Sequence, residues 1–149
     1  MIRKWKETDG ERLSEIEGKA FSKNECHSGD YYKEKSGDSN FTGIVSADDN
    51  DNAASYGVYH SFRGQAMVDA LATDENYRRQ GRATLVLEGL IAEAKEQGRK
   101  CLRLAVRKSN TAAIALYEKS GFRLVYELPL YFTNDDGTKE TAYIMRKNL

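Results

Sequence analysis

The sequence has 149 residues, the size of one domain with a single hydrophobic core. Its 23 Lys and Arg balance 23 Asp and Glu, which argues against a nucleic-acid-binding protein with its basic surplus. No apolar run approaches the roughly 20 residues of a membrane span, no apolar signal segment opens the chain, and two cysteines are too few for a disulfide scaffold. We therefore expect one domain over residues 1–149 in the cytoplasm, without a membrane or nucleic-acid partner.

The first half of the chain predicts a strand, a helix and three further strands. Alternating side chains suit a short strand at Ile2–Trp5, and Asp9 opens a helix. The polar residues 22–40 are expected to form a loop with one helical turn around Tyr31–Lys35. Turns rich in Asp, Asn and Gly then separate the strands Phe41–Ser46, Ala54–Phe62 and Ala66–Thr73. The apolar stripe of the helix consists of Leu13, Ile16, Ala20 and Phe21.

The second half of the chain alternates helices and strands. Apolar residues recur between Ala83 and Ala94 at spacings that place them on one face of a helix, which Gly98 ends. A strand at Cys101–Val106 and a helix at Asn110–Ser120, closed by a glycine, follow. The last two strands, joined by an Asn-Asp-Asp-Gly turn, are Phe122–Phe132 and Thr141–Arg146.

The central unit, residues 66–106, is a strand, a helix and a strand, so its two strands should be parallel with a right-handed crossover. We therefore predict an α/β fold with a mixed, mostly antiparallel sheet, a central parallel strand pair and flanking helices. Ligands of open α/β sheets bind beyond the carboxyl ends of the strands. Here those ends lie near Leu71–Thr73 and Val106–Asn110.

A short motif precedes the longest helix. Gly81 and Ala83 are small residues at the helix start, where backbone N–H groups and the helix dipole attract an anion. Three arginines in the same segment add positive charge, which suits a pyrophosphate. The alternative is an ordinary helix cap with solvated arginines. No Gly-Lys-Ser/Thr follows, so the motif is not a P-loop.

Two segments resemble the GNAT family of N-acetyltransferases. Residues 71–83 resemble its acetyl-CoA signature, whose pattern Arg/Gln-x-x-Gly-x-Gly/Ala is met by Arg78, Gly81 and Ala83. Residues 106–122 resemble the second cofactor segment of the family, and the ending of the chain resembles the branch of alanine N-acetyltransferases that modify ribosomal-protein N-termini. The resemblance covers residues 54–147 and implies the GNAT fold, with its parallel strand pair splayed.

The resemblance implies that acetyl-CoA is the cosubstrate and a primary amine the acceptor. A protein or peptide N-terminus is one candidate acceptor, and a small molecule is another. We expect a monomer or a homodimer. The implied cofactor-binding residues are the strand end and the helix start, together with two residues of the following helix: Leu71, Ala72, Thr73, Arg78, Arg79, Gln80, Gly81, Arg82, Ala83, Asn110 and Tyr117.

Asn110 and Tyr117 each have a second interpretation. Seven residues separate them, so their side chains differ by only about 20° around a helix and can face one cleft. The resemblance makes Asn110 a ligand of the cofactor arm, but an N-cap is equally natural at that position. It makes Tyr117 the acid that protonates the departing thiolate, whereas an ordinary aromatic core residue is the alternative.

The general base is the main departure from the family. Where the N-terminal acetyltransferases carry glutamate, this chain has Ala105, which cannot accept a proton. Asp69, two residues before Leu71, is expected to share its face of the strand and is our candidate base. The alternatives, which are expected near the substrate mouth, are Glu25, His27, Tyr131 and a water molecule.

We thus expect direct acetyl transfer in a ternary complex, because no cysteine is placed to act as a nucleophile. The rival prediction is an acyl-CoA-binding module without turnover, which the missing glutamate favours and Tyr117 opposes. Cys26 and His27 without a second ligand pair do not make a zinc site, so no metal is expected. His60 is most simply a surface histidine.

Overall fold

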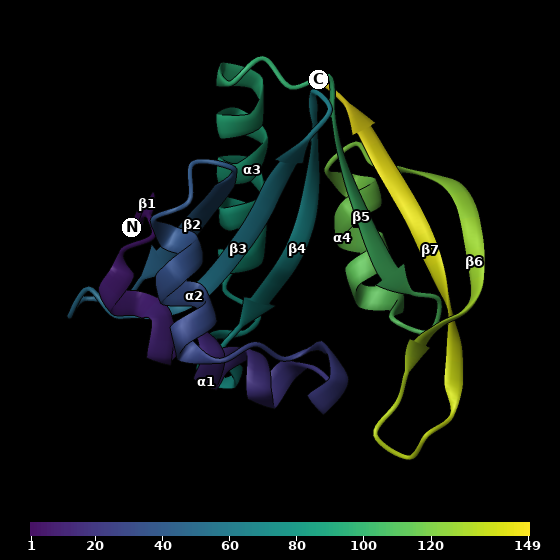
Figure 1. The fold of residues 1–149 in the computed structure, drawn as a ribbon, viewed down its shortest axis with the longest axis horizontal. Helices are drawn as coiled ribbons and strands as arrows, with labels where there is room; N and C mark the ends of the chain where they lie inside the picture. Colours follow the sequence, from purple (N-terminus) through teal and green to yellow (C-terminus); the bar gives the residue numbers. More distant parts are fainter.

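The computed structural model describes residues 1–149, the side chain of Asn24 excepted. Seven strands form one sheet in the order β1-β2-β3-β4-β5-β7-β6, in which only β4 and β5 are parallel neighbours (Figure 1). The mixed sheet with a central parallel pair is therefore confirmed. The strands are β1 Ile2–Lys4, β2 Phe41–Ala47, β3 Ala53–Phe62, β4 Gln65–Thr73, β5 Cys101–Arg107, β6 Arg123–Thr133 and β7 Lys139–Asn148.

Helices cover both faces of the sheet. Helices α1, Gly10–Ala20, and α2, Gly29–Ser36, pack on one face, and α3, Arg82–Glu96, and α4, Thr111–Lys119, pack on the other (Figure 1). Two apolar clusters result because neighbouring strand residues point to opposite faces. Within the described residues, no helix is long and apolar enough to cross a membrane.

Helix α2 differs from the sequence-based expectation, which allowed only one helical turn among residues 22–40. Eight residues are helical, and the Ser28 hydroxyl caps them by accepting a hydrogen bond from the Tyr31 N–H at 3.1 Å. Tyr32 is 2% exposed and packs against the sheet. Its burial stabilises a helix that the polar composition conceals, because tertiary packing supplies most of the stability of a short helix.

The parallel strands β4 and β5 separate along their length. They pair only through Ala66 with Leu102 and Met67 with Arg103, and beyond that point they diverge (Figure 1). Residues 68–73 of β4 and 104–107 of β5 therefore face a gap on one edge while their other edges stay paired with β3 and β7. The predicted splay is thus present.

Strand β4 also contains one extra residue. Val58 pairs with Ala70 and Tyr59 with Val68, so Asp69 has no partner on β3 and forms a β-bulge. A bulge changes the face to which the following residues point. Val68 accordingly packs in the α3–α4 cluster, whereas Ala70 packs in the α1–α2 cluster.

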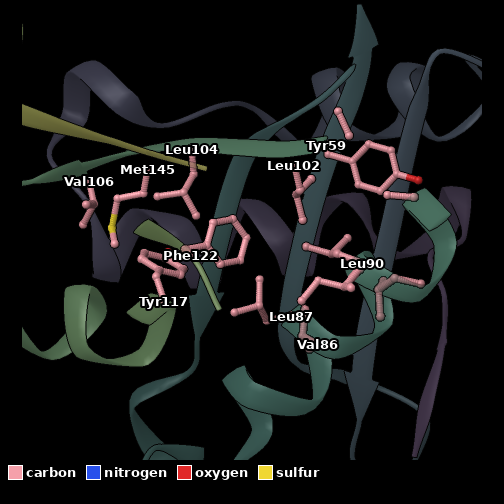
Figure 2. Close-up of a cluster of buried hydrophobic side chains, with 14 residues drawn as sticks. Tyr59, Val86, Leu87, Leu90, Leu102, Leu104, Val106, Tyr117, Phe122 and Met145 are labelled. Carbon is pink, nitrogen blue, oxygen red and sulfur yellow. The ribbon is translucent and has the colours of Figure 1, made fainter. Parts of the chain in front are cut away.

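The core under α3 and α4 reaches the gap between the strands. Leu87 and Leu90 of α3 belong to one buried cluster with Leu102 and Leu104 of β5, and these four side chains are at most 2% exposed (Figure 2). Burying one such leucine is worth roughly 1.5–3 kcal/mol. This core fixes α4 and hence the position of Tyr117, whose ring lies beside the ring of Phe122 at a centroid distance of 5.8 Å (Figure 2).

Candidate active site

A cavity of about 920 Å³ lies where β4 and β5 separate. The strands contribute Asp69, Leu71 and Ala105 to its wall, and α4 and its N-cap contribute Tyr117 and Asn110. The segment between α1 and α2 and the β6–β7 hairpin close the opposite side. Residues predicted from three separate parts of the sequence therefore meet in one cavity.

Tyr117 is both a core residue and a cavity residue. It is 8% exposed and packs against Phe122, yet it lines the cavity. Burial raises the pKa of its hydroxyl to about 12. The hydroxyl therefore carries its proton throughout the neutral range, so it can act as an acid and not as a base there. Tyr117 thus packs in the core, and its role as the acid stays a prediction.

Asn110 is the N-cap of α4, and its role as a cofactor ligand stays a prediction. Its side-chain oxygen accepts a hydrogen bond from the Ala113 N–H at 3.2 Å, which caps α4. The amide nitrogen keeps its two donors, and the side chain lines the cavity. Asn110 can thus hold the helix start and still donate to a ligand.

The helix start predicted to bind pyrophosphate lies just beyond the end of β4 and is separate from the cavity wall. Gly81 is the N-cap of α3 with φ of 76°, and no side chain caps the helix. A Cβ on Gly81 would meet nothing within 4 Å, so the space above the first helical turn is open. Arg79 also has a positive φ, 63°, a conformation that costs a non-glycine residue roughly 1–2 kcal/mol. Strain of this kind gathers at ligand-binding loops.

Two arginines of this loop have structural partners. Arg82 donates to the Ser46 hydroxyl at 2.8 Å and lies over the Tyr77 ring, which anchors the helix start to β2. Arg78 Nε donates to the Thr73 carbonyl at 3.4 Å. The Ser55 hydroxyl also fixes the end of β4, through Thr73 at 2.9 Å. The loop thus offers an anion both the uncapped N–H groups of α3 and the positive charge of its arginines.

Replacing Gly81 with valine should weaken CoA binding at least tenfold, about 1.4 kcal/mol. The β-branched side chain is strained at positive φ and occupies the open space above the helix start. Isothermal titration with CoA measures the change.

Gly98→Val is the matched control, because Gly98 ends the same helix with φ of 75° and has the same open surroundings. Both variants should lose similar stability in thermal unfolding, and only Gly81→Val should lose affinity. Equal CoA affinity in the two folded variants would contradict the pyrophosphate assignment.

The opposite side of the cavity is closed by Arg107. Its guanidinium pairs with Glu25 and donates to the Asn134 side chain at 2.6 Å and to Glu140 at 3.3 Å. Glu25 is therefore engaged in an ion pair rather than free as a base. Tyr131 lines the same side and is 55% exposed.

A buried carboxylate, Glu17, was not predicted from the sequence. It is 1% exposed and accepts hydrogen bonds from the hydroxyls of Tyr32 and Tyr56, the latter at 2.8 Å, and from the backbone N–H of His27. Burial, with the Glu17 charge, raises the pKa of both tyrosines, so both stay donors. The available signal was Glu17 itself, a charged residue within the apolar stripe of α1.

This network fixes His27 at the cavity wall. Its Nδ1 lies 3.1 Å from Glu17 Oε1, and its ring stacks on the Tyr31 ring at 4.1 Å. His27 and Glu17 both line the cavity. Among the described residues, no group of His, Cys, Asp and Glu is arranged to hold a metal ion.

The position of Asp69 requires a correction. The expectation that it shares the face of Leu71 is wrong, because the bulge turns it toward the α1–α2 side while Leu71 packs against the α3–α4 core. Both residues still line the cavity, which passes between the separated strands. His60 is not a free surface histidine, since its Nδ1 lies 2.9 Å from the Asp69 carboxylate.

Known proteins match most of the chain. Residues 10–122 match the model of the acetyltransferase (GNAT) family. The chain is 38% identical over 96 residues to the ribosomal protein bS18-alanine N-acetyltransferase of Escherichia coli strain K12, a match that covers 64% of each chain. It is 42% identical over 83 residues to an N-alpha-acetyltransferase of Saccharolobus solfataricus, covering 55% of this chain and 47% of that one. These matches span less than two thirds of either relative.

The structural match is more extensive. The crystal structure of the ribosomal-protein-S18-alanine N-acetyltransferase from Escherichia coli superposes with a TM-score of 0.86 at 30% sequence identity. The superposition covers 99% of this chain and 92% of that one. The first third of the chain, which the sequence matches in part, is therefore similar in fold as well.

Proposed function

The chain belongs to the acetyltransferase (GNAT) family, and from this premise we propose that it transfers the acetyl group of acetyl-CoA to the N-terminal α-amine of a protein or peptide. The cavity between β4 and β5 is the observation that carries the proposal. It has a buried acid, Tyr117, toward α4 and a carboxylate, Asp69, toward α2, with unpaired strand edges between them.

The chain's residues fit acetyl-CoA along one path. The uncapped start of α3 and Arg78, Arg79 and Arg82 suit the pyrophosphate. The open edge of β4 from Leu71 to Thr73 and the Asn110 amide suit the pantetheine arm, whose amides need hydrogen-bond partners. Tyr117, on the cavity wall, would then serve the thioester end of the molecule. Gln80 and Ala83 complete the loop that faces the pyrophosphate.

Acetyl-CoA supplies the acetyl group as a thioester that an amine can attack directly. Asp69 accepts a proton from the acceptor ammonium, and the nitrogen keeps the electron pair with which it bonds to the acetyl carbon. Unpaired N–H groups of β4 donate hydrogen bonds to the acetyl oxygen as negative charge develops there. Tyr117 donates its proton to the leaving sulfur, and the second proton of the amine nitrogen returns to Tyr117 through solvent.

The relatives of this chain support a protein N-terminus as the acceptor. The relatives named above include an alanine N-acetyltransferase of a ribosomal protein and an N-alpha-acetyltransferase, and we propose the same acceptor class here. Such a substrate, together with the free thiols of Cys26 and Cys101, agrees with a cytoplasmic enzyme. The rival function is acyl-CoA binding without turnover, which Ala105 on the cavity wall favours.

A lysine-free peptide with a free N-terminal alanine tests the proposal. With wild-type protein and acetyl-CoA, we expect thiol release and a peptide heavier by one acetyl group. The same peptide with a blocked N-terminus should give neither signal. Tight acetyl-CoA binding with no thiol release over a panel of peptides and small amines would favour the rival function instead.

A further inference from the structure

Asp69 reaches a histidine because of the bulge in β4. The extra residue between Val68 and Ala70 turns the Asp69 side chain toward α2, where His60 of β3 lies. The Asp69 side chain is 26% exposed, and that of His60 is 35% exposed. Within the described residues, the cavity wall includes Asp69 but not His60, so His60 stands behind the carboxylate as seen from the cavity.

The contact between the two side chains is specific. His60 Nδ1 lies 2.9 Å from both Oδ1 and Oδ2 of Asp69. Because an ionised carboxylate only accepts hydrogen bonds, the tautomer of His60 that carries its hydrogen on Nδ1 is the one that can donate to Asp69. The Phe41 ring lies 5.7 Å from the imidazole and limits its movement on the other side.

We propose that His60 is a positioning residue for acetyl transfer, which holds the Asp69 carboxylate by a hydrogen bond and directs it into the acceptor end of the cavity. The inference rests on the proposed function, in which Asp69 accepts the proton of the acceptor amine. In that step an N–H bond of the ammonium breaks and an O–H bond forms on Asp69. The carboxyl group later releases the proton to water, while His60 keeps its own.

Burial and the neighbouring charged groups act on the pKa of Asp69 in opposite directions. Burial raises the pKa of the carboxyl above its ordinary value. The hydrogen bond and charge of His60 on β3 lower it, and His27, ahead of α2, and Lys35 on α2 act in the same direction at greater range. The neutral Tyr31 hydroxyl also faces this region. His60 is the only one of these groups with a hydrogen bond to Asp69 among the described residues.

Removing His60 should therefore raise the pKa of Asp69 and shift the pH dependence of the reaction. A base works only when ionised, so kcat/KM for the peptide rises with pH through the pKa of Asp69. This rise is the acid limb of the pH profile. In His60→Phe we expect the acid limb at higher pH than in the wild-type protein. The variant should lose about tenfold in kcat/KM on the acid side of the wild-type profile and regain most of the activity once the pH rises above its own limb, with the KM for acetyl-CoA unchanged.

Two further variants separate positioning from a purely structural role. His60→Gln keeps an N–H donor for the carboxylate and should retain more activity at low pH than His60→Phe. The pH profile of Asp69→Asn should lack the acid limb. Adding His60→Phe to Asp69→Asn should lower kcat/KM no further, because the two residues act as one unit. Circular dichroism and thermal unfolding confirm that each variant is folded.

The outcomes distinguish this inference from the proposed function. If the wild-type protein acetylates no peptide, the proposed function fails first. If the wild-type protein does acetylate a peptide, two results would show that His60 does not position Asp69. One is a folded His60→Phe that keeps the wild-type acid limb, and the other is an additive loss of activity in the double variant. A shifted limb with partial rescue by glutamine supports the inference.

Discussion

Replacing Tyr117 with phenylalanine should lower kcat for acetyl transfer about 100-fold or more, in the range expected for loss of a positioned general acid. The hydroxyl acts only as the sulfur departs, so CoA affinity should stay nearly the same. The ring keeps its place beside Phe122 in the core, so the fold should persist. Burial that raises the pKa to about 12 ensures that the wild-type hydroxyl is protonated over the whole assay range.

Single-turnover thiol release is the cleanest measurement, because product release then does not mask the chemical step. Tyr59→Phe provides a matched control: this buried tyrosine belongs to the same apolar cluster, and the cavity wall as described does not include it. It should leave the chemical step unchanged. An equal and small effect in both variants would make Tyr117 a packing residue only.

The second large effect concerns the choice of amine. An α-amine with a pKa near 8 costs about 1.4 kcal/mol to deprotonate at pH 7, and a lysine amine near 10.4 costs about 4.6 kcal/mol. The same carboxylate, Asp69, therefore receives a proton from an α-ammonium about 3 kcal/mol more easily. The lysine nitrogen is the better nucleophile, which offsets part of this difference. We therefore expect kcat/KM to be at least about tenfold higher for the α-amine.

The comparison uses two peptides of otherwise identical sequence at pH 7. One has a free N-terminal alanine and no lysine, and the other has a blocked N-terminus and one lysine. The ratio of kcat/KM should favour the first, and the gap should narrow as the pH rises toward the lysine pKa. Faster acetylation of the blocked lysine peptide would make the protein a lysine acetyltransferase.

The sequence by itself determined most of the second half of the molecule. Helix α3 follows from apolar spacing between Ala83 and Ala94, and its start follows from Gly81, because such signals lie within one element. The parallel pairing of β4 and β5 follows from the crossover rule. Asn110 and Tyr117 line one cavity because seven residues nearly complete two helical turns.

Only the tertiary structure revealed how the acceptor half of the cavity is built. Helix α2 depends on the burial of Tyr32, and Glu17 becomes a carboxylate acceptor only where two tyrosines from other elements meet it. Arg107 engages Glu25, which is 82 residues away in the chain. Asp69 shows the reason most clearly: strand alternation assigns it to the face of Leu71, but one extra residue in β4 turns it to His60. Pairing register is a property of two strands together, so a single strand's pattern cannot reveal a bulge.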